Sequence, residues 1–317
     1  MRKNDPCRIT RYGLRITQSH LERVFELQNM PEALKQYTAR DGTRLWYREW
    51  IPPSPKAVVV CVHGIQSHSG WFVNSCEALA ERGNAVFSLD RRGSGRNESE
   101  RGHVGRWQTL TDDIADFFGT VTQPYGSLRR HLVGVSWGGK LAACFAAVRP
   151  HTVDSLLFVA PGLVPRVVHT VGEMFRIALA AFLKPRARFR IPIDRPEMFT
   201  HTPERIEFIR TDPLMLRECT ARFFIESVRM DRFLRRNAAR VEVPALLLLA
   251  QDDPIIDNES CLKLFQRFGS SRKKIRVFPA VGHTLEFEKD IGFLVGALTA
   301  WIERDYLSGA EASSPVS

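Results

Sequence analysis

The strongest indication of the fold is the segment HLVGVSWGGKLAACFAA, which runs from His131 to Ala147. A short apolar run leads to Ser136, at the centre of GVSWG between Gly134 and Gly138, and an alanine-rich helical run follows. Small glycines beside a serine let the chain turn sharply from strand to helix and present the hydroxyl. The same pattern also fits a glycine-rich connection that carries a surface serine, so the neighbouring segments must decide between the two.

Short apolar runs alternate with helical patterns on both sides of this stretch. Continuous Val, Ile and Leu runs of strand length are typical of a parallel sheet that helices cover on both faces. We therefore predict a doubly wound, mostly parallel α/β fold, in which ligands bind at the carboxyl ends of the strands. The expected strands are Ala57–Val62, Ala85–Leu89, His131–Val135, Val153–Ala160, Ala245–Leu249 and Lys274–Phe278, and the expected helices lie near Trp71–Arg82, Leu110–Val121, Trp137–Val148, Asn258–Phe268 and Ile291–Arg304.

The alternation of strands and helices is preceded by an antiparallel hairpin and is interrupted once. The segment from Gln36 to Trp50 predicts a hairpin, with Asp41 and Gly42 in its turn. Residues 164–243 carry helical periodicity, several prolines and sixteen Lys and Arg against ten Asp and Glu, a net charge of +6. We interpret this interval as a helical cap inserted over the strand ends. The expected divisions are an N-terminal extension at 1–35, core segments at 36–163 and 244–307, and a disordered tail at 308–317.

The composition is that of an ordinary globular protein. The 317 residues, 44% hydrophobic and 25% charged, suffice for a core without disulfides or metals. None of the six cysteines forms a CxxC pair, so we expect reduced, buried thiols. We find neither a signal peptide nor an apolar run of about 18 residues, so we predict a cytoplasmic protein, at most peripheral to a membrane. The net charge of +10 is compatible with acidic ligands or anionic surfaces, but dispersed arginines without an aromatic–basic motif argue against nucleic acid.

A serine hydroxyl becomes an effective nucleophile only when a neighbouring base accepts its proton. Among the nine histidines, His283 is the one that directly follows the last predicted strand. An acid that orients this imidazole is expected after the preceding strand, where Asp252, Asp253 and Asp257 compete. The order nucleophile, acid, histidine along the chain is the one expected of this fold.

The negative charge that develops on a reacting carbonyl oxygen needs backbone N–H donors. One donor is expected from Trp137, the residue after the nucleophile, and the other from the loop after an earlier strand. The sequence VCVHGIQSHSGW supplies that loop, with Gly64 giving the backbone freedom and Ile65 as the expected donor. We expect His63 to brace this loop rather than to act in catalysis.

These segments resemble the monoacylglycerol lipase and lysophospholipase-like branch of the α/β-hydrolase superfamily, over roughly residues 36–306. HGIQSHSGWF, from His63 to Phe72, is similar to that branch's H-G-x-x-x-H-S stretch, and DRRGSG, from Asp90 to Gly95, is similar to its D-x-R-G-x-G turn. Asp212-Pro213-Leu214 resembles a D-P-L triplet of monoacylglycerol lipases. Ser94 and Asn97 depart from the histidine and serine of many relatives.

The resemblance also selects the acid and implies an activity. Aligning Ala250 with the glycine of the branch's G-x-x-D places the acid at Asp253. The implied enzyme cleaves carboxylic esters of a hydrophobic or lipid-like substrate through Ser136, Asp253 and His283, by way of an acyl-enzyme and without metal or organic cofactor. An acyltransferase or thioesterase with the same residues is the alternative. An aminopeptidase and a non-catalytic binding protein of this fold fit less well.

The interval interpreted as a cap contains an apolar helix beside a basic run. Residues from Val171 to Leu183 are apolar enough for a lid helix, and KPRARFR follows them. Apolar side chains beside cations suit docking on an anionic membrane surface. The other interpretation is a helix packed over the site with a solvated basic edge. Either arrangement implies a substrate with an apolar part.

Overall fold

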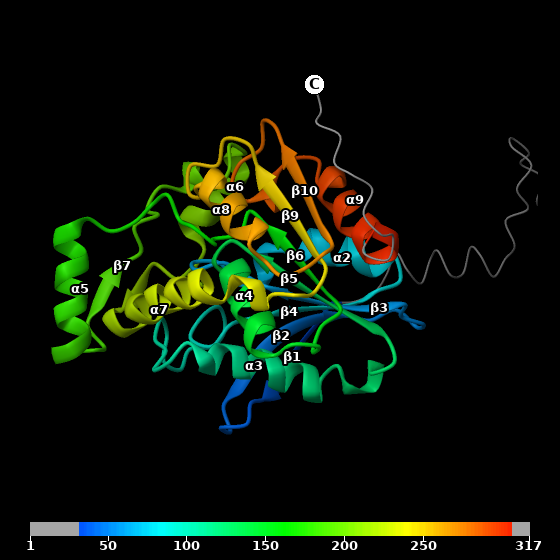
Figure 1. Cartoon of the computed structure of the whole chain (residues 1–317), viewed down its shortest axis with the longest axis horizontal. Helices are drawn as coiled ribbons and strands as arrows, with labels where there is room; N and C mark the ends of the chain where they lie inside the picture. Colours follow the sequence, from blue (N-terminus) through cyan, green and yellow to red (C-terminus); the bar gives the residue numbers. More distant parts are fainter. Residues whose placement is uncertain (1–31, 306–317) are drawn as a thin grey trace, which may run out of the picture.

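The computed structural model describes residues 32–305, built around an eight-stranded sheet (Figure 1). The strand order is β1-β2-β4-β3-β5-β6-β9-β10; β2 runs antiparallel to both of its neighbours, and all other neighbours are parallel. The predicted doubly wound, mostly parallel sheet is confirmed. Most of the expected N-terminal extension and the whole expected tail lie outside the described residues. The strands are β1 (Ala33–Thr38), β2 (Arg44–Trp50), β3 (Ala57–Val62), β4 (Ala85–Leu89), β5 (Arg129–Val135), β6 (Ser155–Val159), β9 (Ala245–Ala250) and β10 (Lys273–Phe278).

The hairpin of β1 and β2 forms the antiparallel edge of the sheet. Its turn contains Gly42 at φ +82°, a conformation that glycine adopts without steric cost, and the Asp41 carboxylate accepts the N–H of Thr43. The first strand begins at Ala33, three residues before the expected start at Gln36. β2 then pairs with β4, which joins the hairpin to the parallel strands.

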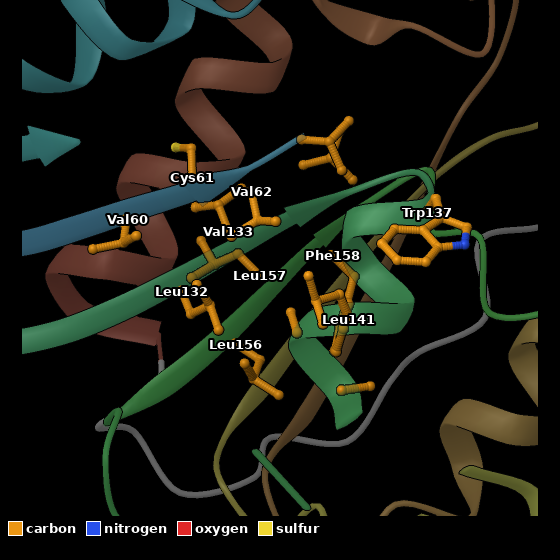
Figure 2. Packing of buried hydrophobic residues seen from close by; sticks show 14 of the residues in the cluster. Val60, Cys61, Val62, Leu132, Val133, Trp137, Leu141, Leu156, Leu157 and Phe158 are labelled. Carbon is orange, nitrogen blue, oxygen red and sulfur yellow. The ribbon is translucent and has the colours of Figure 1, made fainter. Parts of the chain in front are cut away.

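Helices cover both faces of the sheet. α2 (Val73–Glu81) and α9 (Gly292–Ala300) pack together on one face, and α3 (Gln108–Thr120) and α4 (Trp137–Val148) pack together on the other. α8 (Asn258–Gln266) lies after β9 and packs Phe265 edge-on against Phe158 of β6. Every residue of β3, β4, β6 and β9 is buried, as expected for strands covered on both sides. Figure 2 shows this packing, with Leu141 of α4 over the side chains of the central strands.

Some element boundaries differ from those expected. The helix expected near Trp71 begins at Val73, because a 3-10 turn forms first and the N–H of Gly70 donates to His68 Nδ1. The strand expected at Val153–Ala160 is confined to β6. The helix expected to run to Arg304 ends as α9 at Ala300 and continues as a π-helical turn.

The interval 164–243 lies between β6 and β9. It contains α5 (Val171–Leu183), α6 (Pro203–Thr211) and α7 (Ala221–Asn237), and also a ribbon of β7 (Arg188–Arg190) and β8 (Glu218–Thr220) that helical periodicity did not predict. α7 lies against α4, where the Phe223 ring stacks on Trp137 with centroids 5.3 Å apart. α5 and β7 lie at the outer end of the molecule, beyond α7 (Figure 1).

Candidate active site

Ser136 is the single residue between β5 and α4. Its φ of 50° and ψ of −126° lie in a region that side-chain-bearing residues rarely adopt. The strand and the helix approach so closely that a Cβ on Gly134 would lie 2.6 Å from the Cα of Gly139. The predicted sharp turn is therefore present, and it places the serine at the carboxyl end of the sheet.

Two further glycines bring the loop after β3 against this turn. A Cβ on Gly138 would lie 2.2 Å from the carbonyl oxygen of Val62, so no larger residue fits there. A Cβ on Gly64 would lie 3.1 Å from the Cβ of Ser136. The loop that was expected to supply an N–H donor thus lies directly beside the serine.

His283 lies in the loop after β10, and its imidazole bridges Ser136 and Asp253. Nε2 is 3.0 Å from Ser136 Oγ, and Nδ1 is 2.7 Å from Asp253 Oδ2. Asp253 Oδ1 accepts the backbone N–H groups of Ile255 and Ile256 at 2.8 and 3.0 Å. Because the carboxylate accepts at Nδ1, that nitrogen carries the proton and Nε2 is left to accept one from the serine. Both His283 and Asp253 are buried.

The two competing carboxylates lie elsewhere. Asp252 is exposed, although it is the neighbour of Asp253 in the chain. Asp257 caps α8 by accepting the N–H of Ser260 at 3.0 Å. Of the three carboxylates, Asp253 is the one that contacts His283.

The backbone N–H groups of Ile65 and Trp137 are available as donors. Within residues 32–305 neither has a hydrogen-bond acceptor. Trp137 is the first residue of α4, where N–H groups lack intrahelical partners and the helix dipole favours negative charge. The Gly64 N–H is occupied, since it donates to Ser67 Oγ at 3.0 Å.

His63 braces the loop after β3. Its Nε2 accepts the backbone N–H of Arg91 at 3.0 Å, which leaves the proton on Nδ1 to donate to the Gly64 carbonyl at 2.8 Å. Burial lowers the pKa of this imidazole well below its usual value, and the nearby Arg91 charge lowers it further. The neutral imidazole that both hydrogen bonds require is thus the favoured form.

Arg91 contacts the candidate site, although the motifs did not reveal it, because it stands at a variable position of the D-x-R-G-x-G turn. Its guanidinium is buried and donates through Nη2 to the carbonyl oxygens of Gly64, at 2.7 Å, and Ile65, at 3.1 Å. It also lies over the Trp137 ring, 4.7 Å from its centroid. Burial lowers the pKa of Arg91 to about 10, which still leaves it charged at neutral pH.

The D-P-L triplet connects the inserted interval to the loop after β3. Asp212 Oδ2 accepts hydrogen bonds from His68 Nε2 at 3.0 Å and from Trp71 Nε1 at 2.8 Å. Burial raises the pKa of the Asp212 carboxyl, but the bonds from His68 and Trp71 outweigh it and leave the pKa below its usual value. The ionised carboxylate therefore joins the two segments.

Within residues 32–305, the cysteines and the possible metal ligands indicate no second site. Cys61, Cys76, Cys144, Cys219 and Cys261 are buried and form no disulfide, and Cys7 lies outside the described residues. Within residues 32–305 no three His, Cys, Asp or Glu side chains are grouped as metal ligands. In the same range, no helix has both the length and the apolarity needed to cross a bilayer.

Comparison with known proteins places the chain among hydrolases. The family model described as serine aminopeptidase, S33, matches residues 53–290. Monoglyceride lipase of Rattus norvegicus is 26% identical over 82% of this chain and 87% of its own length. A soluble variant of monoglyceride lipase from Saccharomyces cerevisiae, solved with a substrate analogue, superposes with a TM-score of 0.78 at 18% identity, covering 89% of this chain and 98% of that one.

A further relative is longer than this chain. The uncharacterized protein YnbC of Escherichia coli is 24% identical over 87% of this chain, but the match spans only 47% of that protein. The lipases above are ester hydrolases by name, which is the enzyme class that the sequence predicted. The chain belongs to the serine aminopeptidase S33 family of α/β hydrolases, and within it to the branch that resembles monoacylglycerol lipases.

Proposed function

We propose that this protein hydrolyses carboxylic esters of a hydrophobic or lipid-like substrate, with Ser136 as nucleophile, His283 as base and Asp253 as the acid that orients it. The observation that carries the proposal is the chain of contacts from Ser136 Oγ to His283 Nε2, at 3.0 Å, and from His283 Nδ1 to Asp253, at 2.7 Å. This geometry lets one imidazole accept a proton from the serine and later return it.

The first step forms an acyl-enzyme. Ser136 Oγ attacks the ester carbonyl while His283 Nε2 accepts the hydroxyl proton, and the buried Asp253 carboxylate stabilises the resulting imidazolium. The N–H groups of Ile65 and Trp137 donate to the oxyanion. When the C–O bond of the ester breaks, His283 gives its proton to the departing alkoxide, which leaves as the alcohol.

The second step releases the acid. A water molecule gives a proton to His283 and attacks the acyl carbonyl, and the same N–H groups hold the second oxyanion. Collapse of this intermediate returns the proton to Ser136 Oγ. Apart from the ester and this water molecule, residues of the chain supply every group used in the two steps.

The experiment that tests this assignment is labelling with a fluorophosphonate probe. We expect wild type to be labelled and to hydrolyse p-nitrophenyl esters, and folded Ser136→Ala to do neither. Folded wild-type protein that stays unlabelled would contradict the assignment of Ser136. Hydrolysis rates measured on a panel of monoacylglycerols and lysophospholipids then show which lipid ester is preferred.

An acyltransferase or thioesterase with the same three residues is the alternative. Product analysis separates them, since a transferase passes the acyl group to an added alcohol and a thioesterase prefers acyl thioesters. Aminoacyl p-nitroanilides test the aminopeptidase activity that the family's description names.

We further propose that α5 docks on an anionic membrane surface. Its exposed face carries Val171, Phe175 and Phe182, which are 88%, 70% and 85% exposed, while Ile177 on the opposite face is buried. A helix packed over the site by its apolar side would have these residues covered. Burying them at a bilayer interface is favourable.

Exposed cations on and next to α5 favour binding to a membrane surface that is anionic. Arg176 on α5 and Lys184 just after it are exposed, and each cation near such a surface contributes about 1 kcal/mol. We expect binding to vesicles that contain phosphatidylserine to weaken with salt and to fall about ten-fold or more in Phe175→Ser/Phe182→Ser. Val228→Ser, at an exposed apolar residue of α7, is the control. Equal binding by all three proteins would contradict the proposal.

A further inference from the structure

A cavity of about 510 Å³ lies next to the candidate active site, between the inserted interval and the loop after β3. Its wall includes Gln66, which directly follows Ile65, and Phe199, whose ring packs edge-on against His283 with centroids 6.1 Å apart. Leu216, also on the wall, donates its N–H to the Gln66 carbonyl at 2.8 Å. The cavity wall therefore shares residues with the loop that carries Ile65 and with the surroundings of His283.

Four arginines border this cavity: Arg101, Arg188, Arg190 and Arg217. Among residues 32–305, none of them forms an ion pair with a carboxylate. Arg101, Arg188 and Arg217 donate to backbone carbonyl oxygens, and the Arg190 guanidinium has no partner in that range. Each guanidinium has further N–H groups that can donate hydrogen bonds to a bound anion.

Three carboxylates also border the cavity, and they do not neutralise the arginines. Asp212 is engaged by His68 and Trp71. Asp194 and Glu218 are the other two, and within the described part of the chain neither lies within 4.0 Å of an arginine nitrogen of the cavity. Four arginines against three carboxylates leave a net positive charge of one around the cavity.

We propose that this cavity binds an anionic head group of the ester substrate, a phosphate or a carboxylate. The arginines hold the anion, and Ile191, Ile193 and Met215 line the apolar part of the wall. The inference rests on the proposed ester hydrolysis and specifies its substrate: an ester whose alcohol part is anionic.

The test uses short-chain esters in free solution, so that membrane binding makes no contribution. The substrates are 1-butanoylglycerol, its 3-phosphate, the corresponding butanoyl ester of glyceric acid, and p-nitrophenyl butanoate as a neutral reporter. We expect wild type to have a kcat/KM at least about ten-fold higher for an anionic ester than for 1-butanoylglycerol. The phosphate and carboxylate substrates identify which anion is preferred.

Variants of the cavity arginines test whether the cavity causes the preference for anionic esters. Arg190→Gln and Arg217→Gln should each lower kcat/KM for the preferred anionic ester about ten-fold relative to kcat/KM for p-nitrophenyl butanoate, through a higher KM for the anionic ester. Arg195→Gln is the matched control, because Arg195 is an exposed arginine of the same segment that does not border the cavity.

The outcomes separate this inference from the proposed function. Hydrolysis of p-nitrophenyl butanoate without a preference for anionic esters overturns the inference alone, and so does an equal loss in Arg190→Gln and Arg195→Gln. If folded wild type neither cleaves the reporter nor reacts with a fluorophosphonate, the proposed function fails and the inference fails with it.

Discussion

The guanidinium of Arg91 donates a hydrogen bond of 2.7 Å to the carbonyl oxygen of Gly64. That oxygen belongs to the same peptide group as the N–H of Ile65. His63 Nδ1 donates to the same oxygen at 2.8 Å, so one peptide is held by a cation and a neutral imidazole. Both contacts fix the orientation of the Ile65 N–H. The positive charge of Arg91 also polarises the peptide group, which makes this N–H a stronger hydrogen-bond donor.

Arg91→Met should therefore lower kcat for a p-nitrophenyl ester by about ten- to a hundred-fold, with a small change in KM. Arg91→Lys, which keeps the charge but not the planar fork, should recover part of the loss. Arg96→Met changes an exposed arginine of the same loop and serves as the control. Steady-state kinetics with thermal unfolding check the prediction. An equal fall in kcat for Arg91→Met and Arg96→Met would refute it.

The two neighbouring aspartates should respond very differently to the same change. Asp253→Asn should lower kcat by about a thousand-fold or more, because an amide no longer holds the required tautomer of His283. Asp252→Asn should stay within about two-fold, since Asp252 is exposed. The rate of fluorophosphonate labelling measures both variants without any assumption about the substrate. Similar losses would show that the contact with His283 does not matter.

Glu286 should make stability depend on pH. Burial raises the pKa of its carboxyl to about 7, while Oε1 accepts the N–H of Ser75 and Oε2 has no donor within the described range. The folded-state pKa lies above the unfolded one, so the unfolded state loses its proton first, and the free energy of unfolding falls as pH rises from about 4.5 to about 7.

Glu286→Gln should remove this dependence. We expect the variant to be more stable than wild type at pH 8, by up to about 3 kcal/mol, and the difference to vanish near pH 4.5. Urea unfolding of both proteins at several pH values measures it. A difference that stays constant across this pH range would contradict the assignment to Glu286.

Two helical glycines should differ sharply in their tolerance of alanine. Gly138→Ala places a methyl group 2.2 Å from the Val62 carbonyl oxygen, so we expect lost activity and a large loss of stability. Gly296→Ala, in α9, meets nothing within 4 Å and should be neutral or stabilising by up to about 1 kcal/mol. Thermal unfolding of both variants and of wild type measures the changes in stability. A stable and active Gly138→Ala would mean that the loop after β3 can move away from α4.

Much of the fold could be predicted because the strands of a buried parallel sheet have an easily recognised local sequence pattern. Continuous apolar runs such as AVVVCV and ALLLLA need both faces covered, and they correspond to β3 and β9. The β7–β8 ribbon was missed because three-residue strands carry no detectable period. The interval around it is rich in arginine and proline, which obscured the pattern further.

Local patterns in the sequence were enough to predict that Ser136 lies in the turn between a strand and a helix and that His283 follows the last strand. Carboxyl ends of parallel strands meet at one edge, so strand order alone brings such residues together. The motif alignment had selected Asp253 as the acid, and the tertiary structure adds its contact with His283, from which the neighbouring Asp252 points away. It also decided the partner of Arg91 and the outward apolar face of α5. Periodicity shows which side of a helix is apolar, and three-dimensional packing determines what covers that side.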